Sequence, residues 1–255
     1  MRAVRRALVL VLCVVASFGV LGVGDAQATG SVCASVLGSA PVRGPANAVA
    51  WRAAIEMPIA VFGRAPVGRT LGRPTAWLTP ADAPWVLVIA RPRAGVGRCW
   101  VQVRLPWRPN DAAGWVNANN VVLEQTRWRI EVSTGRRTLT LFRAGVPIRT
   151  LSVVVGKPST PTPVGLFAIV WAIPWNPNDF LGSWVLELTA HSNVLQQFDG
   201  GDGTVGIHGR GGASLLDPLG SAASHGCVRL ANDDIDWLVN AIGTSRLPGT
   251  PVQIG

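Results

Sequence analysis

Apolar positions in the first half of the chain come in short runs that suit β-strands. Residues 85–89 and 99–103 have the composition of strands, and residues 114–117 and 121–123 are shorter runs of the same kind. Proline and glycine break the sequence between them, and no stretch there keeps a helical period. The pattern predicts a small β-barrel over residues 49–124.

The second half opens with a hairpin pattern. Ile130 and Val132 alternate with polar residues before a Ser-Thr-Gly turn, and Leu139 and Leu141 alternate after it. One face of this hairpin is therefore expected to be buried. Prolines exclude regular structure from residue 158 to residue 165. Further apolar runs predict strands at residues 151–155, 166–173, 184–188, 205–207 and 251–254.

One helix is predicted near the C-terminus. Asn232 is expected to cap it, with acidic residues in the first turn where the helix dipole favours them, and Gly243 ends it. Its apolar positions follow the helical period at Ile235, Leu238, Val239 and Ile242. The predicted fold is therefore mainly β: a small barrel, then a β-rich domain over residues 125–255 with one C-terminal helix.

The N-terminal 28 residues have the parts of a secretory signal peptide. Basic residues precede an apolar run over residues 7–23, and Ala26-Gln27-Ala28 fits a cleavage site. The mature chain is expected to begin with a linker over residues 29–48. The apolar run is slightly long for a signal, so an uncleaved membrane anchor is the alternative. Both interpretations predict export.

Export changes what the four cysteines imply. Cys13 lies in the expected signal peptide, which leaves Cys33, Cys99 and Cys227. An odd number of thiols in an oxidising compartment leaves one unpaired. The simplest pairing joins Cys33 to Cys99, and Cys227 then stays free for chemistry. An ordinary buried thiol is the alternative interpretation of Cys227.

Charge argues against a nucleic-acid partner. The chain has 23 Lys and Arg residues against 14 Asp and Glu residues, a formal net charge of +9 at pH 7. Lys157 is its single lysine, and the arginines are scattered along the sequence. A nucleic-acid-binding protein would gather such residues on one element or face. A basic surface does suit an anionic cell envelope.

Residues able to carry chemistry gather at Ser224-His225-Gly226-Cys227, with fifteen residues between His208 and Ser224. A thiol attacks as thiolate, so Cys227 needs a lowered pKa or a base, and histidine suits that role near neutrality. His225 is only two residues away, whereas His208 ends a predicted strand and can approach across the sheet. Gly226 lets backbone amides converge on one point, where they can bind an oxyanion.

This pattern resembles the signature of the L,D-transpeptidases of the YkuD family. The likeness covers residues 128–254 and includes His208, the Ser-His-Gly-Cys run that ends at Cys227, and the following apolar residue and Arg229. It also includes Gly-Lys-Pro and Thr-Pro-Thr-Pro-Val-Gly within residues 156–165. Through its Gly-Trp-Val strand, the first domain resembles bacterial SH3-like domains.

The resemblance implies a β-sandwich-like catalytic domain that acts on peptidoglycan stem peptides. Cys227 would attack the carbonyl of the third residue, expel the terminal D-alanine and form a thioester. An amine of a neighbouring stem would resolve this thioester to a 3→3 cross-link. His208 carries over as the base. The backbone of His225, Gly226 and Cys227 carries over as the oxyanion site.

Other roles implied by the resemblance concern the surroundings of the thiol. Ser224 and His225 would orient the site, and the carbonyl of Gly209 would hold the second nitrogen of the His208 ring. Arg229 stands where the family often has Asn, and we expect it to bind a substrate carboxylate. The resemblance implies no cofactor and no metal, location in the cell wall or periplasmic space, and inhibition by carbapenems.

Three alternatives remain open from the sequence. His191, His208, His225 and Cys227 could form a zinc site, although His-x-Cys is an uncommon ligand spacing. The same nucleophile would serve a hydrolase, such as a carboxypeptidase or amidase, because only access of the acceptor separates the two reactions. The third alternative is a catalytically silent wall-binding protein.

Overall fold

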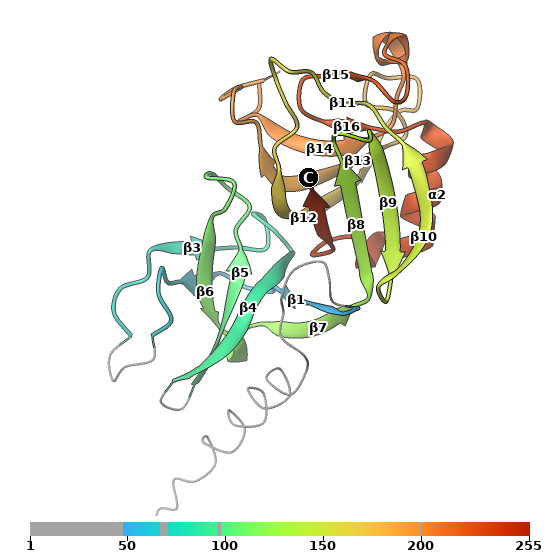
Figure 1. Ribbon diagram of the computed structural model, residues 1–255. Coiled ribbons are helices and arrows are strands. Elements are labelled where there is room, and N and C mark those ends of the chain that lie inside the picture. Colours follow the sequence, from blue (N-terminus) through green and yellow to red (C-terminus); the bar gives the residue numbers. More distant parts are fainter. Residues whose placement is uncertain (1–47, 67–70, 96–97, 199) are drawn as a thin grey trace, which may run out of the picture.

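The computed structural model describes residues 48–66, 71–95, 98–198 and 200–255. The predicted signal peptide, the predicted linker up to residue 47, and Cys33 lie outside these residues. The described chain forms two units, which we call the first and second units, and the change from one to the other falls at Arg127 (Figure 1). The prediction had placed this boundary between residues 124 and 125.

The first unit is an antiparallel five-stranded sheet with a separate two-stranded pair, β2 (Ile59–Val61) and β3 (Ala76–Leu78). The five strands lie in the order β6-β5-β4-β1-β7. Their bounds are β1 (Ala50–Ala54), β4 (Trp85–Gly95), β5 (Arg98–Arg104), β6 (Ala113–Asn117) and β7 (Val122–Thr126). The all-β prediction for this unit is confirmed, while its likeness to SH3 domains stays a prediction.

The second unit is built on an eight-stranded sheet in the order β10-β9-β8-β17-β12-β13-β14-β16. A short parallel pair, β11 (Val155–Gly156) and β15 (Ala222–Ser224), lies beside it. The bounds of the eight strands are β8 (Trp128–Ser133), β9 (Thr138–Arg143), β10 (Val146–Ser152), β12 (Gly165–Pro174), β13 (Trp184–His191), β14 (Thr204–His208), β16 (Val228–Arg229) and β17 (Pro251–Ile254). The mainly β fold is confirmed.

The predicted hairpin explains how this sheet buries one face. Ile130 pairs with Leu141 and Val132 with Leu139, so all four apolar side chains lie on the same side and are buried. They join a core to which β12, β13 and β14 also contribute, together with the helix α2 (Asn232–Ile242). Within the described residues α2 is the single α-helix, and its predicted apolar face is the one that packs on the core.

The predicted cap of this helix is wrong. Ala231 is the N-cap residue and makes no side-chain capping bond, and Asn232 is the first helical residue. The Asn232 side chain instead binds backbone groups of two loops, as described below. The Asn232 side-chain amide therefore makes tertiary contacts, although the local sequence pattern predicted that it would cap the helix.

The two units pack against each other around β12. Val170 and Trp171 of this strand pack into the core of the first unit. Arg52 of β1 is buried and donates from Nη1 to the carbonyl oxygens of Ser245 and Pro248, at 3.1 and 2.9 Å. Figure 1 shows β1, β4 and β7 beside the lower end of the second unit. Buried apolar contacts and charge-assisted hydrogen bonds therefore fix the first unit on the second.

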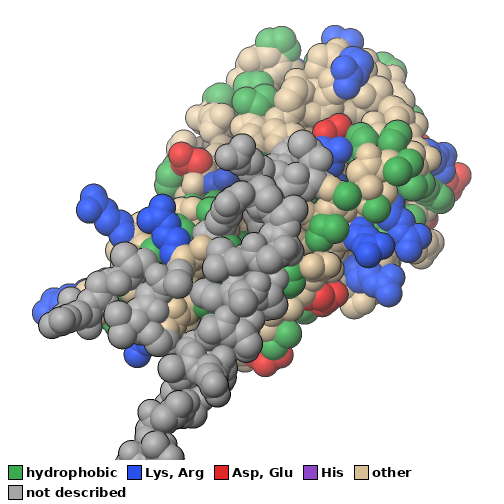
Figure 2. Space-filling model, turned by 60° about the horizontal axis from the view of Figure 1, so that its bottom comes forward, with side chains coloured by type: hydrophobic (Ala, Val, Ile, Leu, Met, Phe, Trp, Pro, Cys, Tyr) green, Lys and Arg blue, Asp and Glu red, His purple; other side chains and the backbone are tan. Residues whose placement is uncertain are grey.

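The described surface fits the prediction of scattered charge. Figure 2 shows several separate groups of Lys and Arg side chains on one face, with acidic side chains among them. The described residues include no helix that is long and apolar enough to span a bilayer.

The cysteines behave in two ways. Cys99 is disulfide-bonded, whereas Cys227 is the free cysteine of the described residues. The expected partner of Cys99, Cys33, lies outside the described residues, so the pairing of these two stays a prediction.

Candidate functional site

Two parallel strands bring His208 and the Cys227 segment together. β14 and β16 pair so that Ile207 faces Val228 and His208 faces Arg229. Cys227 comes directly before β16 and lies beside Gly206, whose N–H donates to the Cys227 Sγ at 3.5 Å. Groups that are far apart in the sequence therefore meet where these two strands run side by side.

Ser224 holds the turn that presents Cys227. Its Oγ accepts from the N–H of Gly226 at 3.1 Å and donates to the carbonyl oxygen of Cys227 at 2.6 Å. Gly226 has a φ of +123°, which glycine adopts readily and other residues avoid. Because Ser224 uses the Gly226 N–H, the expected oxyanion site depends on the amides of His225 and Cys227.

The proline-rich segment supports this turn from the other side. The carbonyl oxygen of Ser224 accepts from the N–H of Lys157 at 3.0 Å and from the Thr160 Oγ1 at 3.3 Å. The Oγ1 of Thr162 accepts from the Gly156 N–H at 2.8 Å, and a Cβ on Gly156 would overlap the backbone of this segment. The motif within residues 156–165 therefore has a structural reason, since it holds the Cys227 turn in place.

A cavity of about 50 Å³ opens at this turn. Both Cys227 and His208 line it, so one open space contacts the predicted nucleophile and the predicted base. Much of the remaining wall is apolar, and it includes Phe180, Leu181, Leu195, Phe198 and Val205. A mostly apolar cavity with a few polar groups at one end is the usual form of a small-molecule site.

Cys227 is half-buried. Burial raises the pKa of its thiol above the ordinary value, while the Gly206 N–H and the positive charge of Arg229 act in the opposite direction. At neutral pH the resting group is therefore the thiol. Reaction as a nucleophile requires a base to take its proton.

His208 is suited to be that base. The side chain is 2% exposed, and its Nδ1 lies 2.7 Å from the carbonyl oxygen of Gly209, which is the contact that the sequence predicted. Burial, assisted by the charge of Arg229, lowers the pKa of His208 to about 4, although hydrogen bonds to the Gly209 and Leu181 backbones raise it. The ring is thus neutral near pH 7, with Nδ1 protonated and Nε2 basic. Among the described residues, no hydrogen bond joins it to Cys227.

Arg229 is placed differently from a freely exposed substrate-binding group. Its guanidinium is buried, donates from Nη1 to the Asp217 Oδ2 at 2.6 Å, and lies 4.7 Å from the ring centroid of Phe180. The Phe180 ring in turn lies 6.4 Å from the His208 ring. Arg229 still lines the cavity, so its charge acts on both His208 and Cys227.

His225 lies at the mouth of the cavity. Its exposed ring stacks on Phe198 at a centroid distance of 5.4 Å, and its Nε2 is 3.2 Å from the Lys157 Nζ. Burial, and then the charges of Lys157 and Arg229, lower the pKa of His225. Its backbone shapes the turn, and its side chain forms part of the cavity wall.

His191 is not part of the cavity. It is 1% exposed, and its Nε2 lies 3.1 Å from the Asp202 Oδ2. Its ring therefore has a structural contact. In the described part of the chain, no group of three or more His, Cys, Asp or Glu side chains is arranged to hold a metal ion.

Sequence reasoning missed Asn232 as a residue that shapes the site. Its Oδ1 accepts from the N–H groups of Ser183 and Arg210, at 3.2 and 3.0 Å, and its Nδ2 donates to the Pro177 carbonyl oxygen at 3.1 Å. A Cβ on Gly209 would overlap this Oδ1. Glycine directly after His208 was the signal, since it marks a close approach of another group. Phe180 and Asp217 lie in irregular loops and gave no signal.

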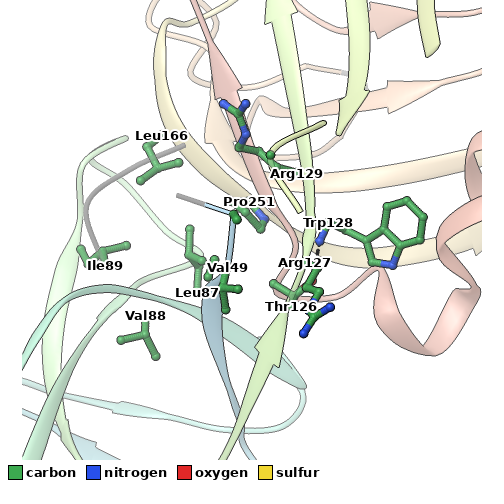
Figure 3. A pocket seen from close by; sticks show the side chains of 13 residues that line it. Val49, Leu87, Val88, Ile89, Thr126, Arg127, Trp128, Arg129, Leu166 and Pro251 are labelled. Atoms are coloured by element: carbon green, nitrogen blue, oxygen red, sulfur yellow. Dashed lines mark hydrogen bonds between the residues drawn. The ribbon is translucent and has the colours of Figure 1, made fainter. Parts of the chain in front are cut away.

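A second cavity, of about 20 Å³, lies between the two units (Figure 3). Figure 3 shows its wall, to which Val49 and Leu87 of the first unit and Leu166 and Pro251 of the second contribute. The wall includes no cysteine, histidine or carboxylate. This cavity has no group for nucleophilic or acid–base chemistry, whereas the cavity at Cys227 contains both a thiol and an imidazole, so the cavity at Cys227 is the candidate active site.

We expect Arg229→Gln to make Cys227 less reactive at a given pH. Removing the positive charge raises the pKa of the thiol, so the midpoint of the pH profile for alkylation by iodoacetamide should move to higher pH. The unfolding free energy should fall by on the order of 2 kcal/mol, since a buried partner of the half-exposed Asp217 is lost. Arg210→Gln is the control, because Arg210 binds the Ser214 and Leu215 carbonyls. An unchanged midpoint in Arg229→Gln would contradict the assigned electrostatic role.

The chain is similar in sequence to known proteins. The chain is 35% identical over 127 residues to a putative L,D-transpeptidase YkuD of Bacillus licheniformis, which covers 50% of this chain and 65% of that protein. It is 29% identical over 136 residues to L,D-transpeptidase 1 of Mycobacterium tuberculosis, with 48% of each chain covered. The chain thus spans less than two thirds of the length of these relatives.

A solved structure of an L,D-transpeptidase in complex with imipenem is also similar. It matches with a TM-score of 0.39 and 18% identity, over 62% of this chain and 91% of the other. The family model described as the L,D-transpeptidase catalytic domain, YkuD, matches residues 127–254, which are the second unit with Cys227 and His208. The chain therefore belongs to the YkuD family of L,D-transpeptidase catalytic domains.

Proposed function

We propose that the protein is an exported peptidoglycan L,D-transpeptidase with Cys227 as its nucleophile and His208 as its general base. The donor is a stem peptide of peptidoglycan, and the product is a 3→3 cross-link. One observation carries the proposal: within the region that matches the family, the free thiol and a buried neutral histidine line the same open cavity.

The first half of the proposed reaction forms a thioester. The Nε2 of His208 takes the proton of the Cys227 thiol as its sulfur attacks the carbonyl carbon of the third stem residue. The bond to the terminal D-alanine then breaks, and its amine leaves with the proton from His208. No hydrogen bond joins the two side chains in the structure, and such catalytic bonds commonly form only when the substrate is bound.

The charge of the tetrahedral intermediate needs donors near its oxygen. We propose the backbone N–H groups of His225 and Cys227, because Ser224 already uses that of Gly226. A donor of this kind contributes about 3 kcal/mol to the stability of the transition state. Ser224 acts in this step by holding the turn in shape.

The second half transfers the acyl group. An amine on a neighbouring stem attacks the thioester carbonyl, His208 takes the proton of that amine, and the Cys227 sulfur leaves and is reprotonated. Water in place of the amine would give a hydrolase with the same residues. The side chains of Arg229 and Lys157 give the cavity and its mouth a positive charge, which suits the carboxylates of stem peptides.

Carbapenem inhibition and a wall-facing first unit belong to the same proposal. A β-lactam ring presents a strained carbonyl, and attack by Cys227 would open the ring and leave a covalent adduct. The first unit, proposed to be SH3-like, would face the cell wall. Export through the N-terminal segment delivers both units to their substrate.

Incubation with purified stem peptides, followed by mass spectrometry, tests this function. We expect dimers that have lost one D-alanine and carry a 3→3 linkage. Monomers that have lost D-alanine, without dimers, would assign the hydrolase instead. Unchanged peptides, from protein whose Cys227 still reacts with iodoacetamide, would overturn both reactions and favour a silent wall-binding protein.

A further inference from the structure

Arg108 crosses from the first unit into the second. It lies between β5 and β6, and its guanidinium binds three backbone carbonyls close to the active-site cavity. Nη1 donates to the oxygen of Ser192 at 2.8 Å, and Nη2 donates to those of Leu195 and Asp202, at 3.0 and 2.9 Å. The three acceptors belong to two segments, residues 192–195 and residues 202–203, which we call the two arms. One side chain of the first unit thus joins both arms.

Asn110 makes a second connection at the base of the arms. Its Oδ1 accepts from the His191 N–H at 2.6 Å, and its Nδ2 donates to the His191 carbonyl oxygen at 2.7 Å. The same Nδ2 lies 2.8 Å from the Asn193 Oδ1. The amide pairs with the end of β13 as a neighbouring strand would, so it fixes the point at which the first arm leaves the sheet.

The arms form part of the wall of the Cys227 cavity. Ser192, Leu195 and Gly203 line it. The arms are also tied to each other, because the Ser192 N–H donates to the Gly203 carbonyl oxygen at 2.8 Å. Gly203 has a φ of +78°, and a Cβ there would overlap the Leu195 carbonyl and crowd the Arg108 guanidinium. The arms are thus packed closely around the side chain from the first unit.

Neither Arg108 nor Asn110 lines the cavity itself. Their contacts therefore act on the wall and leave Cys227, His208 and the Ser224 turn untouched. A planar guanidinium suits this task, since its two Nη groups can donate in fixed directions to carbonyls of separate segments. Its charge also strengthens these hydrogen bonds.

We propose that Arg108 and Asn110 are positioning residues, through which the first unit sets the wall that receives the donor peptide. The first unit then determines how tightly the peptide binds, while the chemistry of the thiol is independent of it. The identity of the peptide as a stem peptide rests on the proposed function, whereas the positioning of the arms does not.

The test compares full-length wild type with Arg108→Ala, Arg108→Lys and Asn110→Ala. Hydrogen–deuterium exchange of the amides of residues 192–195 should become about tenfold faster in Arg108→Ala, because hydrogen bonds to a charged group are lost. The KM for the stem peptide should rise by about tenfold, while kcat stays within about twofold. The rate of Cys227 alkylation by iodoacetamide should not change. Arg108→Lys keeps the positive charge but loses the two separate Nη donors. Its KM should therefore lie between those of wild type and Arg108→Ala.

Arg64→Ala is the matched control, since Arg64 is an exposed arginine of the same unit, and it should behave as wild type in every assay. Unchanged exchange in Arg108→Ala would overturn the positioning of the arms. Faster exchange with an unchanged KM, or equal losses in kcat and alkylation, would overturn the effect on substrate binding. Wild type that fails to turn over stem peptides, together with faster exchange in the variant, would contradict the proposed function and still support the positioning of the arms.

Discussion

Cys227→Ala is expected to abolish turnover of stem peptides, with a fall in kcat of at least about 10⁴-fold, because no other group at the cavity can form the thioester. The fold should persist. The Cys227 side chain accepts one weak hydrogen bond, from the Gly206 N–H at 3.5 Å, and the turn is held by its backbone and Ser224. Product analysis by mass spectrometry measures the loss, and thermal unfolding checks the fold.

Ser221→Ala is the matched control for this variant. Ser221 lies in the segment that leads to the same turn, and its buried Oγ has no hydrogen-bond partner, so its loss should leave turnover near the wild-type value. Turnover retained by Cys227→Ala would show that the nucleophile is wrongly assigned. Lost turnover together with a lowered unfolding temperature would show a structural role for the thiol.

The residues proposed to carry chemistry could be located from the sequence because their signals are local. Cysteine parity and the Ser-His-Gly-Cys motif both indicate Cys227, and the structure confirms that it is a free thiol. The strand that ends in His208 was readable as an apolar run, and the hairpin from Ile130 to Leu141 as an alternation. Patterns of this kind depend on residues close in the sequence, so they can be recognised without knowledge of the tertiary contacts.

What the sequence did not reveal depends on contacts between distant segments. No sequence pattern indicated that Asp217, twelve residues earlier in an irregular loop, pairs with the guanidinium of Arg229. Asn232 was assigned to a helix cap and instead holds two loops together. Arg108 looks like one of many scattered arginines until the units are packed. No periodicity encodes such partners, because they are set only when the chain is folded.

His208→Ala is expected to lower kcat/KM by about 10³-fold, in the range typical of losing a general base, and His191→Ala should cost far less. Since burial lowers the pKa of His208 to about 4, the base stays neutral and active well below pH 6.5. The acidic limb of kcat/KM should therefore have its midpoint near pH 4. A midpoint near 6.5, or equal losses in the two variants, would show that His208 is not the base.

The lowered pKa of His208 should also make the stability of the fold depend on pH. The pKa of His208 is about 4 in the folded state and about 6.5 in the unfolded chain. Above pH 6.5 both states are neutral at this group, so its contribution to the unfolding free energy is complete. As the pH falls from 6.5 toward 4 the unfolded chain binds a proton that the folded state does not, and this contribution is lost. The wild type should thus lose about 3 kcal/mol of unfolding free energy through this group between pH 7 and pH 4. His208→Gln should lack that part of the loss, and urea unfolding at both pH values measures the difference. Parallel pH profiles for wild type and His208→Gln would mean that the imidazole is not buried in its neutral form, and the neutral base required by the proposed mechanism would lose its support.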